Sequence, residues 1–188
     1  MTKSSDMTTK SSGSGTVAST AAAIMDDMKT DSGIKDDARK KLVETLNMRL
    51  SDEYVLYTKT RKYHWNVIGP RFHQLHEFFK LQYEALDEMV DEIAEKIRHM
   101  GGKSLGTLEE FASNSSINEE PGQYPDAQTM ISNLLNDHEA IIKTLRKNAD
   151  EAEELEDKST NDFILEAVQK HEKMAWMLRA HLEGKDRI

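Results

Sequence analysis

Residues 63–76 read YHWNVIGPRFHQLH and place a Gly-Pro corner between two stretches of helical pattern. Proline disfavours helix in the residue before it, and glycine permits a tight turn. The segment therefore predicts that one helix ends near Trp65 and that a second begins near Phe72. It also carries three of the seven histidines of the chain, namely His64, His73 and His76.

Apolar residues recur at three- and four-residue spacing on both sides of this corner, as they do on the buried face of a helix. The first helix is expected from about Asp36, and the second is expected to end at Gly101-Gly102. The first stripe comprises Leu42, Leu46, Leu50, Tyr54 and Tyr57. The second comprises Leu75, Phe78, Phe79, Leu86, Met89, Val90, Ile93, Ile97 and Met100.

A long crossover to about Pro125 precedes two further helices. We expect a short helix at about 107–112, a third long helix from about Asp126 and a fourth from about Phe163. An acidic hinge is predicted between the last two, at residues 150–162. No strand pattern is present, so the expected fold class is all-α. This connectivity is typical of a ferritin-like four-helix bundle, with the short helix in the crossover between helices two and three.

The composition limits the classes of function. The 188 residues suffice for one domain with a sizeable core. The absence of cysteine excludes disulfides and thiolate metal sites. A net charge of -9 favours cations as partners and opposes a surface that binds nucleic acid all over.

Composition also divides the chain into segments. Residues 1–33 are rich in Ser, Thr and Gly, which predicts a flexible N-terminal arm. Residues 34–184 are expected to form the bundle, and residues 185–188 a C-terminal tail. No apolar run approaches the roughly 20 residues of a membrane span. Residues 1–15 lack the apolar core of a secretory signal, so we expect a cytoplasmic protein without membrane association.

Two pairs of possible metal ligands lie along the second helix. Asp91 and Glu95 are four residues apart and share one helix face. His76 precedes Asp91 by fifteen positions, which is about 22 Å at the rise of an α-helix. These groups therefore cannot hold the same ion within one chain. His64 can approach His76 if the first two helices pair antiparallel.

A two-fold dimer would join the two half-sites. If the second helix packed antiparallel on its copy, His76 of one chain would meet Asp91 and Glu95 of the other. Imidazole with carboxylate suits ferrous iron or manganese, with zinc as a competitor. The usual intrabundle di-iron site requires Glu-x-x-His motifs, and no histidine here has a glutamate three residues before it.

Structural interpretations of the same residues remain open. The histidines at the helix ends can serve packing, Trp65 can be a packing residue, and Asp91 with Glu95 can belong to a solvated row of charges. His138 and His171 fall on the apolar stripes of the third and fourth helices and are expected to be satisfied core histidines. A helical scaffold without chemistry is consistent with these interpretations.

The chain resembles the Dps family of ferritin-like mini-ferritins from about residue 36 to residue 183. The family pattern is a His-Trp pair, a glycine turn, Phe-x-x-Leu-His and then Asp-x-x-x-Glu. The matching residues are His64-Trp65, Gly69, Phe72, Leu75-His76, Asp91 and Glu95. The spacing of all these residues is intact.

The resemblance implies an intersubunit ferroxidase site, with His64 and His76 from one subunit and Asp91 and Glu95 from its two-fold mate. It implies a hollow homododecamer that oxidises Fe(II), preferentially with hydrogen peroxide and otherwise with oxygen, and stores the ferric mineral inside. Such chemistry protects against oxidative damage. For Trp65 the resemblance implies a redox or packing role beside the site.

One position departs from the family pattern. Many relatives carry an acidic residue four positions after the second histidine, where it helps to hold a second iron, and this chain has Lys80 there. An ammonium group one turn from His76 repels Fe(II) or pairs with a nearby carboxylate. We therefore expect one firm iron position and a weak second one.

The acidic segment before the fourth helix resembles the carboxylates that line three-fold pores in the family. Carboxylates around a pore draw cations inward by electrostatic focusing. The candidates are Glu151, Glu154, Asp157 and Asp162. A solvated charge run is the alternative interpretation, and it is weakest for Asp162, which lies in the family's Thr-Asn-Asp motif.

An alternative function is a nucleoid-binding protein that protects DNA by physical association, since some Dps proteins bind DNA through lysine-rich arms. Residues 1–33 hold three lysines against four aspartates, a net charge of 3 − 4 = −1. Phosphate binding needs several cations and weakens with salt, although twelve arms acting together can still bind weakly. The composition of the arm therefore gives DNA binding little support.

Overall fold

The computed structural model describes residues 30–183. The predicted N-terminal arm up to residue 29 and the predicted C-terminal tail lie outside the described residues. Residues 30–35 precede the first described helix and are not helical.

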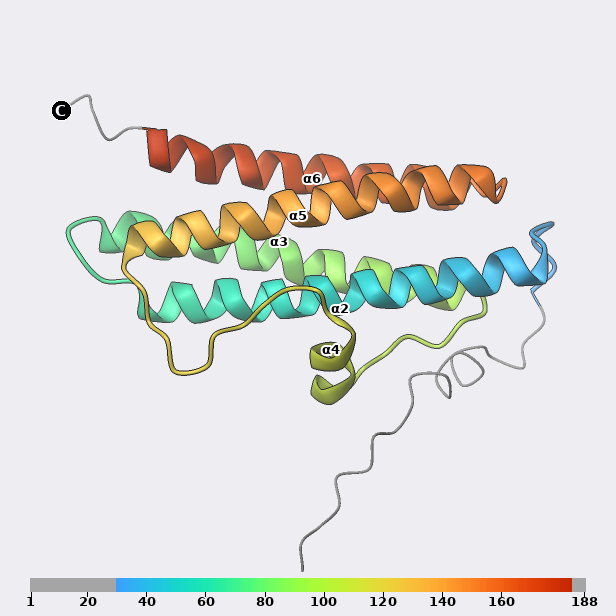
Figure 1. The fold of residues 1–188 in the computed structure, drawn as a ribbon, viewed down its shortest axis with the longest axis horizontal. Helices are drawn as coiled ribbons and strands as arrows, with labels where there is room; N and C mark the ends of the chain where they lie inside the picture. Colours follow the sequence, from blue (N-terminus) through green and yellow to red (C-terminus); the bar gives the residue numbers. More distant parts are fainter. Residues whose placement is uncertain (1–29, 184–188) are drawn as a thin grey trace, which may run out of the picture.

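Four long helices lie side by side along nearly their whole length (Figure 1). They are α2 (Asp36–Asn66), α3 (Phe72–His99), α5 (Ala127–Glu154) and α6 (Lys158–Glu183). α2 pairs with α3, and α5 pairs with α6. The part of the chain from residue 30 to residue 183 contains no strand, which confirms the all-α prediction.

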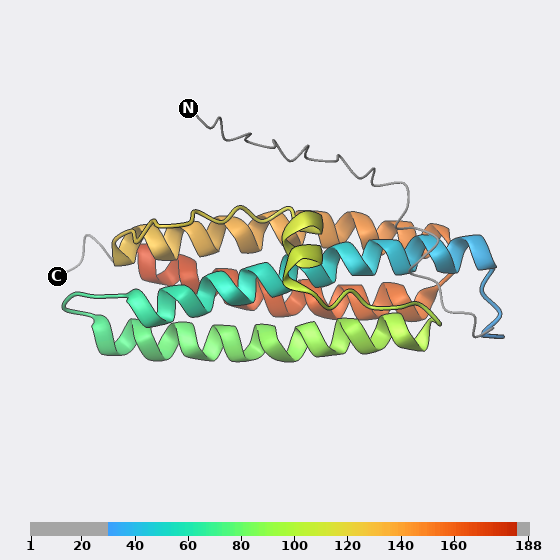
Figure 2. The ribbon, with the colours of Figure 1, turned by 90° about the horizontal axis from the view of Figure 1, so that it is seen from below.

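The crossover runs from one end of the bundle to the other and carries the short helix α4 (Leu108–Asn114) against α2 (Figure 2). Thr107 and Glu110 form a capping box that starts α4, since each side chain bonds the backbone amide of the other residue. The predicted four-helix bundle with a short helix in its long crossover is therefore confirmed.

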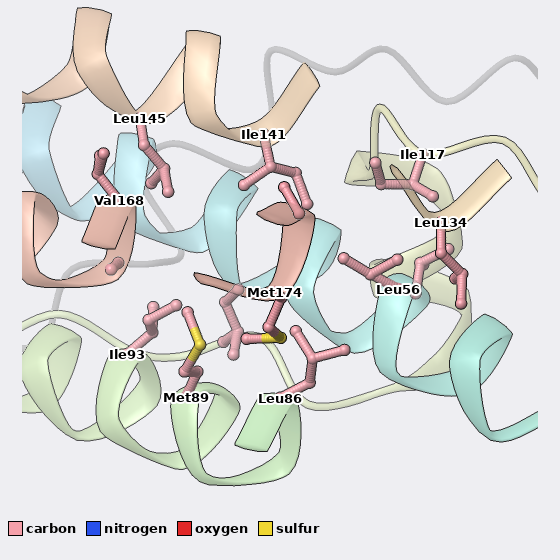
Figure 3. Packing of buried hydrophobic residues seen from close by; sticks show 14 of the residues in the cluster. Leu56, Leu86, Met89, Ile93, Ile117, Leu134, Ile141, Leu145, Val168 and Met174 are labelled. Carbon is pink, nitrogen blue, oxygen red and sulfur yellow. The ribbon is translucent and has the colours of Figure 1, made fainter. Parts of the chain in front are cut away.

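All four long helices contribute apolar side chains to one core (Figure 3). Leu56, Leu86, Leu134, Ile141 and Met174 are all buried and approach one another at the middle of the bundle. Burial of such side chains contributes about 1.5–3 kcal/mol each. This packing fixes how far each helix is rotated about its axis, and so which polar residues face inward.

Both predicted glycine corners are present. At the first, Gly69 has a φ of 115°, a conformation that residues with a Cβ rarely adopt. At the second, Gly102 lies so close to α2 that a Cβ atom would stand 2.5 Å from a methyl carbon of Val43. The first corner turns the chain from α2 into α3, and the second lets the end of α3 pack on α2.

The predicted acidic hinge is mostly wrong. Helix continues through Glu154 and starts again at Lys158, so only residues 155–157 connect α5 to α6. The run of Glu and Ala before the break consists of strong helix formers, which explains the longer α5. Asp157 begins α6, because its carboxylate accepts hydrogen bonds from the Thr160 amide at 3.0 Å and the Thr160 hydroxyl at 2.5 Å.

Among the helices that the structure describes, none combines the length and the apolar character that crossing a membrane requires.

Candidate metal centre

The corner between α2 and α3 brings His64 and His76 together. Their rings stack at 3.8 Å between centroids, with an angle of 23° between the planes. His64 Nδ1 lies 2.7 Å from the backbone oxygen of His76, and His76 Nδ1 lies 2.9 Å from that of His64. Each imidazole is thus fixed by the backbone of the residue that carries the other.

This reciprocal contact selects one tautomer. A carbonyl oxygen only accepts hydrogen bonds, so each Nδ1 must carry the proton and donate it. In the neutral ring Nε2 then keeps its lone pair, which is the form in which histidine binds metals. Neither Nε2 has a hydrogen-bond partner among residues 30–183. The pair therefore suits Fe(II), manganese or zinc as two imidazole ligands.

Asp91 and Glu95 lie on the same helix as His76 and are both exposed. α3 is unbroken from Phe72 to His99, so the separation of about 22 Å between His76 and Asp91 applies. Within the described residues, no hydrogen bond or ion pair involves either carboxylate, and no three His, Asp or Glu side chains are arranged to hold a metal ion. One chain therefore holds two separate half-sites.

Aromatic residues surround the histidine pair. The Tyr83 ring lies edge-on to His64 with centroids 5.2 Å apart, and Phe72 lies 5.1 Å from His76. The Arg61 guanidinium lies over the rings of Trp65 and Tyr83, at 5.2 and 5.5 Å from their centroids. Trp65 itself is 63% exposed, so it does not pack into the core of this chain.

Neither Tyr83 nor Arg61 was predicted from the sequence to lie at the site. One signal for Tyr83 was available, because it follows His76 by seven residues and therefore lies on the same face of α3 two turns later. Its position against His64 depends on how α2 packs on α3, which no local pattern reveals.

Lys80 lies one turn after His76, and its Nζ is 3.8 Å from the Glu84 carboxylate. Both side chains are about half exposed, at 44% and 52%. Exposed pairs of this kind contribute little. The positive charge of Lys80 therefore remains close to the face of α3 that carries the histidine.

The four pore candidates occupy different surroundings. Glu151 pairs with Lys41 Nζ at 2.7 Å, and this hydrogen bond and charge raise the pKa of Lys41. Asp157 is buried and caps α6, so its carboxylate is already bound. Glu154 and Asp162 are exposed, and within residues 30–183 neither forms an ion pair or a hydrogen bond. Asp162 is thus free to attract cations, and Glu154 is partly so, because its charge also raises the pKa of Lys41.

The core histidines form a row with Glu53. His171 Nε2 is 2.7 Å from the Glu53 carboxylate, and His171 Nδ1 is 2.8 Å from His138 Nδ1. All three side chains are fully buried. His171 has two partners, but His138 Nε2 has none in the described part of the chain. The expectation of satisfied core histidines therefore holds for His171 and is wrong for His138.

Comparisons with known proteins agree with this fold. A family model for the ferritin-like domain matches residues 43–188. The chain is 41% identical, over 81% of its length and 86% of the relative, to an uncharacterised low temperature-induced protein of Nostoc sp.. It is 38% identical, over 76% of its length and 97% of the relative, to DNA protection during starvation protein 2 of Bacillus anthracis.

A solved structure gives the same result. The Dps protein of Bacillus brevis has a TM-score of 0.75 and 33% identity to this chain, and the match covers 79% of this chain and 99% of that one. The two curated relatives and this structure each match three quarters of the chain or more. The chain therefore belongs to the Dps family of ferritin-like proteins.

Proposed function

We propose that this protein oxidises Fe(II) at sites formed between two subunits and stores the ferric product inside a dodecameric shell. Its ferritin-like domain and its Dps relatives support iron storage or DNA protection in general. The observation that carries the finer proposal is the reciprocal contact of His64 and His76, which leaves two imidazole lone pairs at one corner of the bundle.

The remaining ligands come from a second copy of the chain. An isologous interface in which α3 packs antiparallel on its copy places Asp91 and Glu95 of the partner subunit near His76. The two carboxylates neutralise the charge of Fe(II), and the two imidazoles complete a set of four ligands that leaves positions open for an oxidant. Manganese and zinc are competitors for the same donor set.

The reaction moves electrons from iron to peroxide or oxygen. Hydrogen peroxide needs two electrons and two protons to become two molecules of water, and two Fe(II) ions supply the electrons in the overall balance. Consuming both reactants at a protein site withdraws them from the reaction in solution that generates hydroxyl radicals. The function we propose is therefore protection against oxidative damage as well as storage.

Cations reach the interior through acidic pores in this proposal. The exposed carboxylates of Glu154 and Asp162 are the strongest candidates for attracting them, because neither forms an ion pair or a hydrogen bond in the described residues. Of the two, Asp162 is the stronger, since the charge of Glu154 also acts on Lys41. Glu151 contributes less because Lys41 neutralises it. Asp157 is the weakest candidate, because its carboxylate is buried and caps α6.

A mixing experiment tests whether the site lies between subunits. One variant carries His64→Ala and His76→Ala, and the other carries Asp91→Asn and Glu95→Gln. Each alone should oxidise almost no Fe(II). Dimers that contain one subunit of each kind keep one intact site, so co-assembly from equal amounts should restore about one quarter of the wild-type sites.

The assay is peroxide-dependent Fe(II) oxidation followed by absorbance of the ferric product. His73→Ala is the matched control, because His73 is exposed and lies outside the proposed ligand set. No recovery on mixing, despite proven co-assembly, would contradict a site shared between subunits. Full activity in the histidine variant would contradict the proposed site itself.

DNA protection by binding is the second candidate, favoured by the name of the Bacillus anthracis relative. Gel shifts at low and physiological salt, with and without residues 1–33, distinguish it from iron chemistry. Binding that depends on the arm and survives physiological salt would support it. The arm's charge of −1 predicts that such binding is absent or disappears as salt rises.

A further inference from the structure

A chain of aromatic rings leads away from the histidine pair. Tyr83 lies 5.2 Å from His64, Tyr57 lies 6.1 Å from Tyr83, and Tyr54 lies 5.8 Å from Tyr57, all between ring centroids. Arg61 holds this group together, because its guanidinium lies over Tyr57 and Tyr83 and donates a hydrogen bond to the Tyr57 hydroxyl. The rings thus connect α2 and α3 beside the proposed iron ligands.

A single Fe(II) at the proposed site supplies too few electrons to reduce hydrogen peroxide to water. Reducing hydrogen peroxide to water takes two electrons, and one Fe(II) supplies only one. Lys80 stands one turn from His76, where its charge opposes a second Fe(II). Peroxide that receives a single electron releases a hydroxyl radical, so a site with one firm iron position requires another electron donor in contact with it.

We propose that Tyr83 is this donor, with Tyr57 behind it as the next ring in the chain. This inference rests on the proposed function, since it assigns a further residue to the same reaction. The Tyr83 ring is in contact distance of a proposed iron ligand, so an electron needs no mobile carrier to reach the reacting centre. Tyr83 is also partly exposed, which gives its phenolic proton a route to solvent.

Arg61 favours the tyrosines over Trp65 as the donor. A tyrosine loses its proton together with the electron, so the radical that it leaves is neutral. An indole is first oxidised to a cation, and the Arg61 guanidinium 5.2 Å from the Trp65 ring repels that cation. The positive charge of Arg61 therefore disfavours oxidation of Trp65 and leaves Tyr83 as the donor.

Fe(II) gives one electron, the Tyr83 hydroxyl gives one electron and one proton, and solvent gives one more proton. The O–O bond of hydrogen peroxide breaks, and both oxygens leave as water. The products are Fe(III) and a neutral tyrosyl radical. A second Fe(II), with a proton from solvent, then reduces the radical to the phenol and becomes Fe(III).

Rapid freezing of the assembled protein, loaded with one Fe(II) per site and mixed with peroxide, tests the proposal by electron paramagnetic resonance. We expect a transient tyrosyl radical whose signal narrows when the protein contains ring-deuterated tyrosine. This measurement needs no substitution, so it does not depend on the folding of a variant. A signal that changes with deuterated tryptophan instead would overturn the assignment to Tyr83.

Two variants locate the radical. In Tyr83→Phe the signal should be lost, and the hydroxyl radical captured by a spin trap, per Fe(II) oxidised, should rise several-fold. Tyr124→Phe is the control, because Tyr124 is exposed on the crossover, and it should match the wild type in both measurements. An unchanged signal and an unchanged radical yield in Tyr83→Phe would refute the proposal.

Iron binding separates this inference from the proposed function. A titration that shows two equally tight Fe(II) ions per site would overturn the need for a tyrosine donor, while leaving iron oxidation intact. A wild-type protein that oxidises no Fe(II) would instead overturn the proposed function.

Discussion

At the scale of single residues, reciprocal hydrogen bonds fix the two histidines at the α2–α3 corner. His64 and His76 each donate a proton from Nδ1 to the other's backbone oxygen, so neither ring can turn without breaking a bond to the other. The contact fixes the tautomer as well as the orientation. Two imidazoles held in this way lose little freedom when a metal binds, which strengthens the binding.

The buried row of Glu53, His171 and His138 has one proton arrangement when both histidines are neutral. The carboxylate accepts from His171 Nε2, and His171 Nδ1 then accepts from His138 Nδ1. His138 Nε2 keeps a lone pair without a partner in the described residues. Burial, and after it the repulsion that a charged His171 would exert, lower the pKa of His138 well below its usual value. His138 therefore stays neutral in the folded protein.

This pKa predicts a loss of stability in mild acid. Below about pH 6.5 the unfolded chain takes up a proton at His138 and the folded chain does not, so the free energy of unfolding falls by roughly 1.4 kcal/mol per pH unit. Above that pH the two states bind equal numbers of protons at this site, and the effect disappears. The free energy of unfolding, derived from melting curves between about pH 5 and pH 7.5 at constant protein concentration, should show this slope.

The variant His138→Leu should have a shallower slope, and His73→Gln, at an exposed position, should keep the wild-type slope. His181 also has a pKa lowered by burial and then by Arg71, and its contribution remains in both proteins. Equal slopes in the wild type and in His138→Leu would show that His138 gains its proton in the folded state too.

At the scale of the elements, α3 acts as a rigid spacer. It carries His76 in its first turns and Asp91 and Glu95 further along, with no break between them. The rise of a helix is fixed by its backbone hydrogen bonds. Substitutions that leave α3 helical cannot bring the two half-sites together.

The short connection between α5 and α6 depends on Asp157. Its carboxylate satisfies the Thr160 amide at the start of α6, and Glu156 completes the turn with a φ of 62°. Asp157→Ala should therefore lower the free energy of unfolding by about 1 kcal/mol, the usual effect of losing a helix cap. The check is a comparison of melting curves at matched protein concentration.

Asp162→Asn is the control at the same end of α6, because Asp162 is exposed and has no partner among the described residues. Its effect on unfolding should stay within about 0.5 kcal/mol. In the proposed pore, Asp162→Asn should instead slow the uptake of iron. A large loss of stability in Asp162→Asn, with none in Asp157→Ala, would reverse these two assignments.

At the scale of the whole molecule, one chain is incomplete for the proposed reaction. The carboxylate half-site is exposed on α3, and the imidazole half-site combines buried His64 of α2 with half-buried His76 of α3. The described residues of one chain supply no third ligand to either half-site. In the proposed two-fold dimer, a second copy would provide the ligands that each half-site lacks. Assembly and iron oxidation should therefore be lost together.

Leu81→Arg tests this dependence. Leu81 is 63% exposed on α3, where a charge would stand at the proposed two-fold interface beside Lys80. We expect the variant to lose the dimer, as measured by sedimentation, and to lose peroxide-dependent Fe(II) oxidation with it. Leu165→Arg, at an exposed site on α6, should keep the dimer. A monomer with full iron turnover would refute the intersubunit site.

Much of this protein follows from the sequence alone. The Gly-Pro corner, the apolar stripes and the long crossover predicted the bundle. Turn preference and helical periodicity depend on neighbouring residues, and the length of a connection can be read directly along the chain. The separation of His76 from Asp91 was also predictable, since helix geometry does not depend on surroundings. The prediction of a hinge at residues 150–162 was wrong, because it relied on the charge of the segment and not on the high helix propensity of its Glu and Ala residues.

Only the tertiary structure decided how side chains from different helices meet. The stacking of His64 on His76, the edge contact of Tyr83 and the unpartnered nitrogen of His138 all depend on the rotation of packed helices about their axes. That rotation is fixed by the fit of the whole core, such as the close approach of Gly102 to Val43. Local patterns carry no information about it, because close packing is a property of all four helices together.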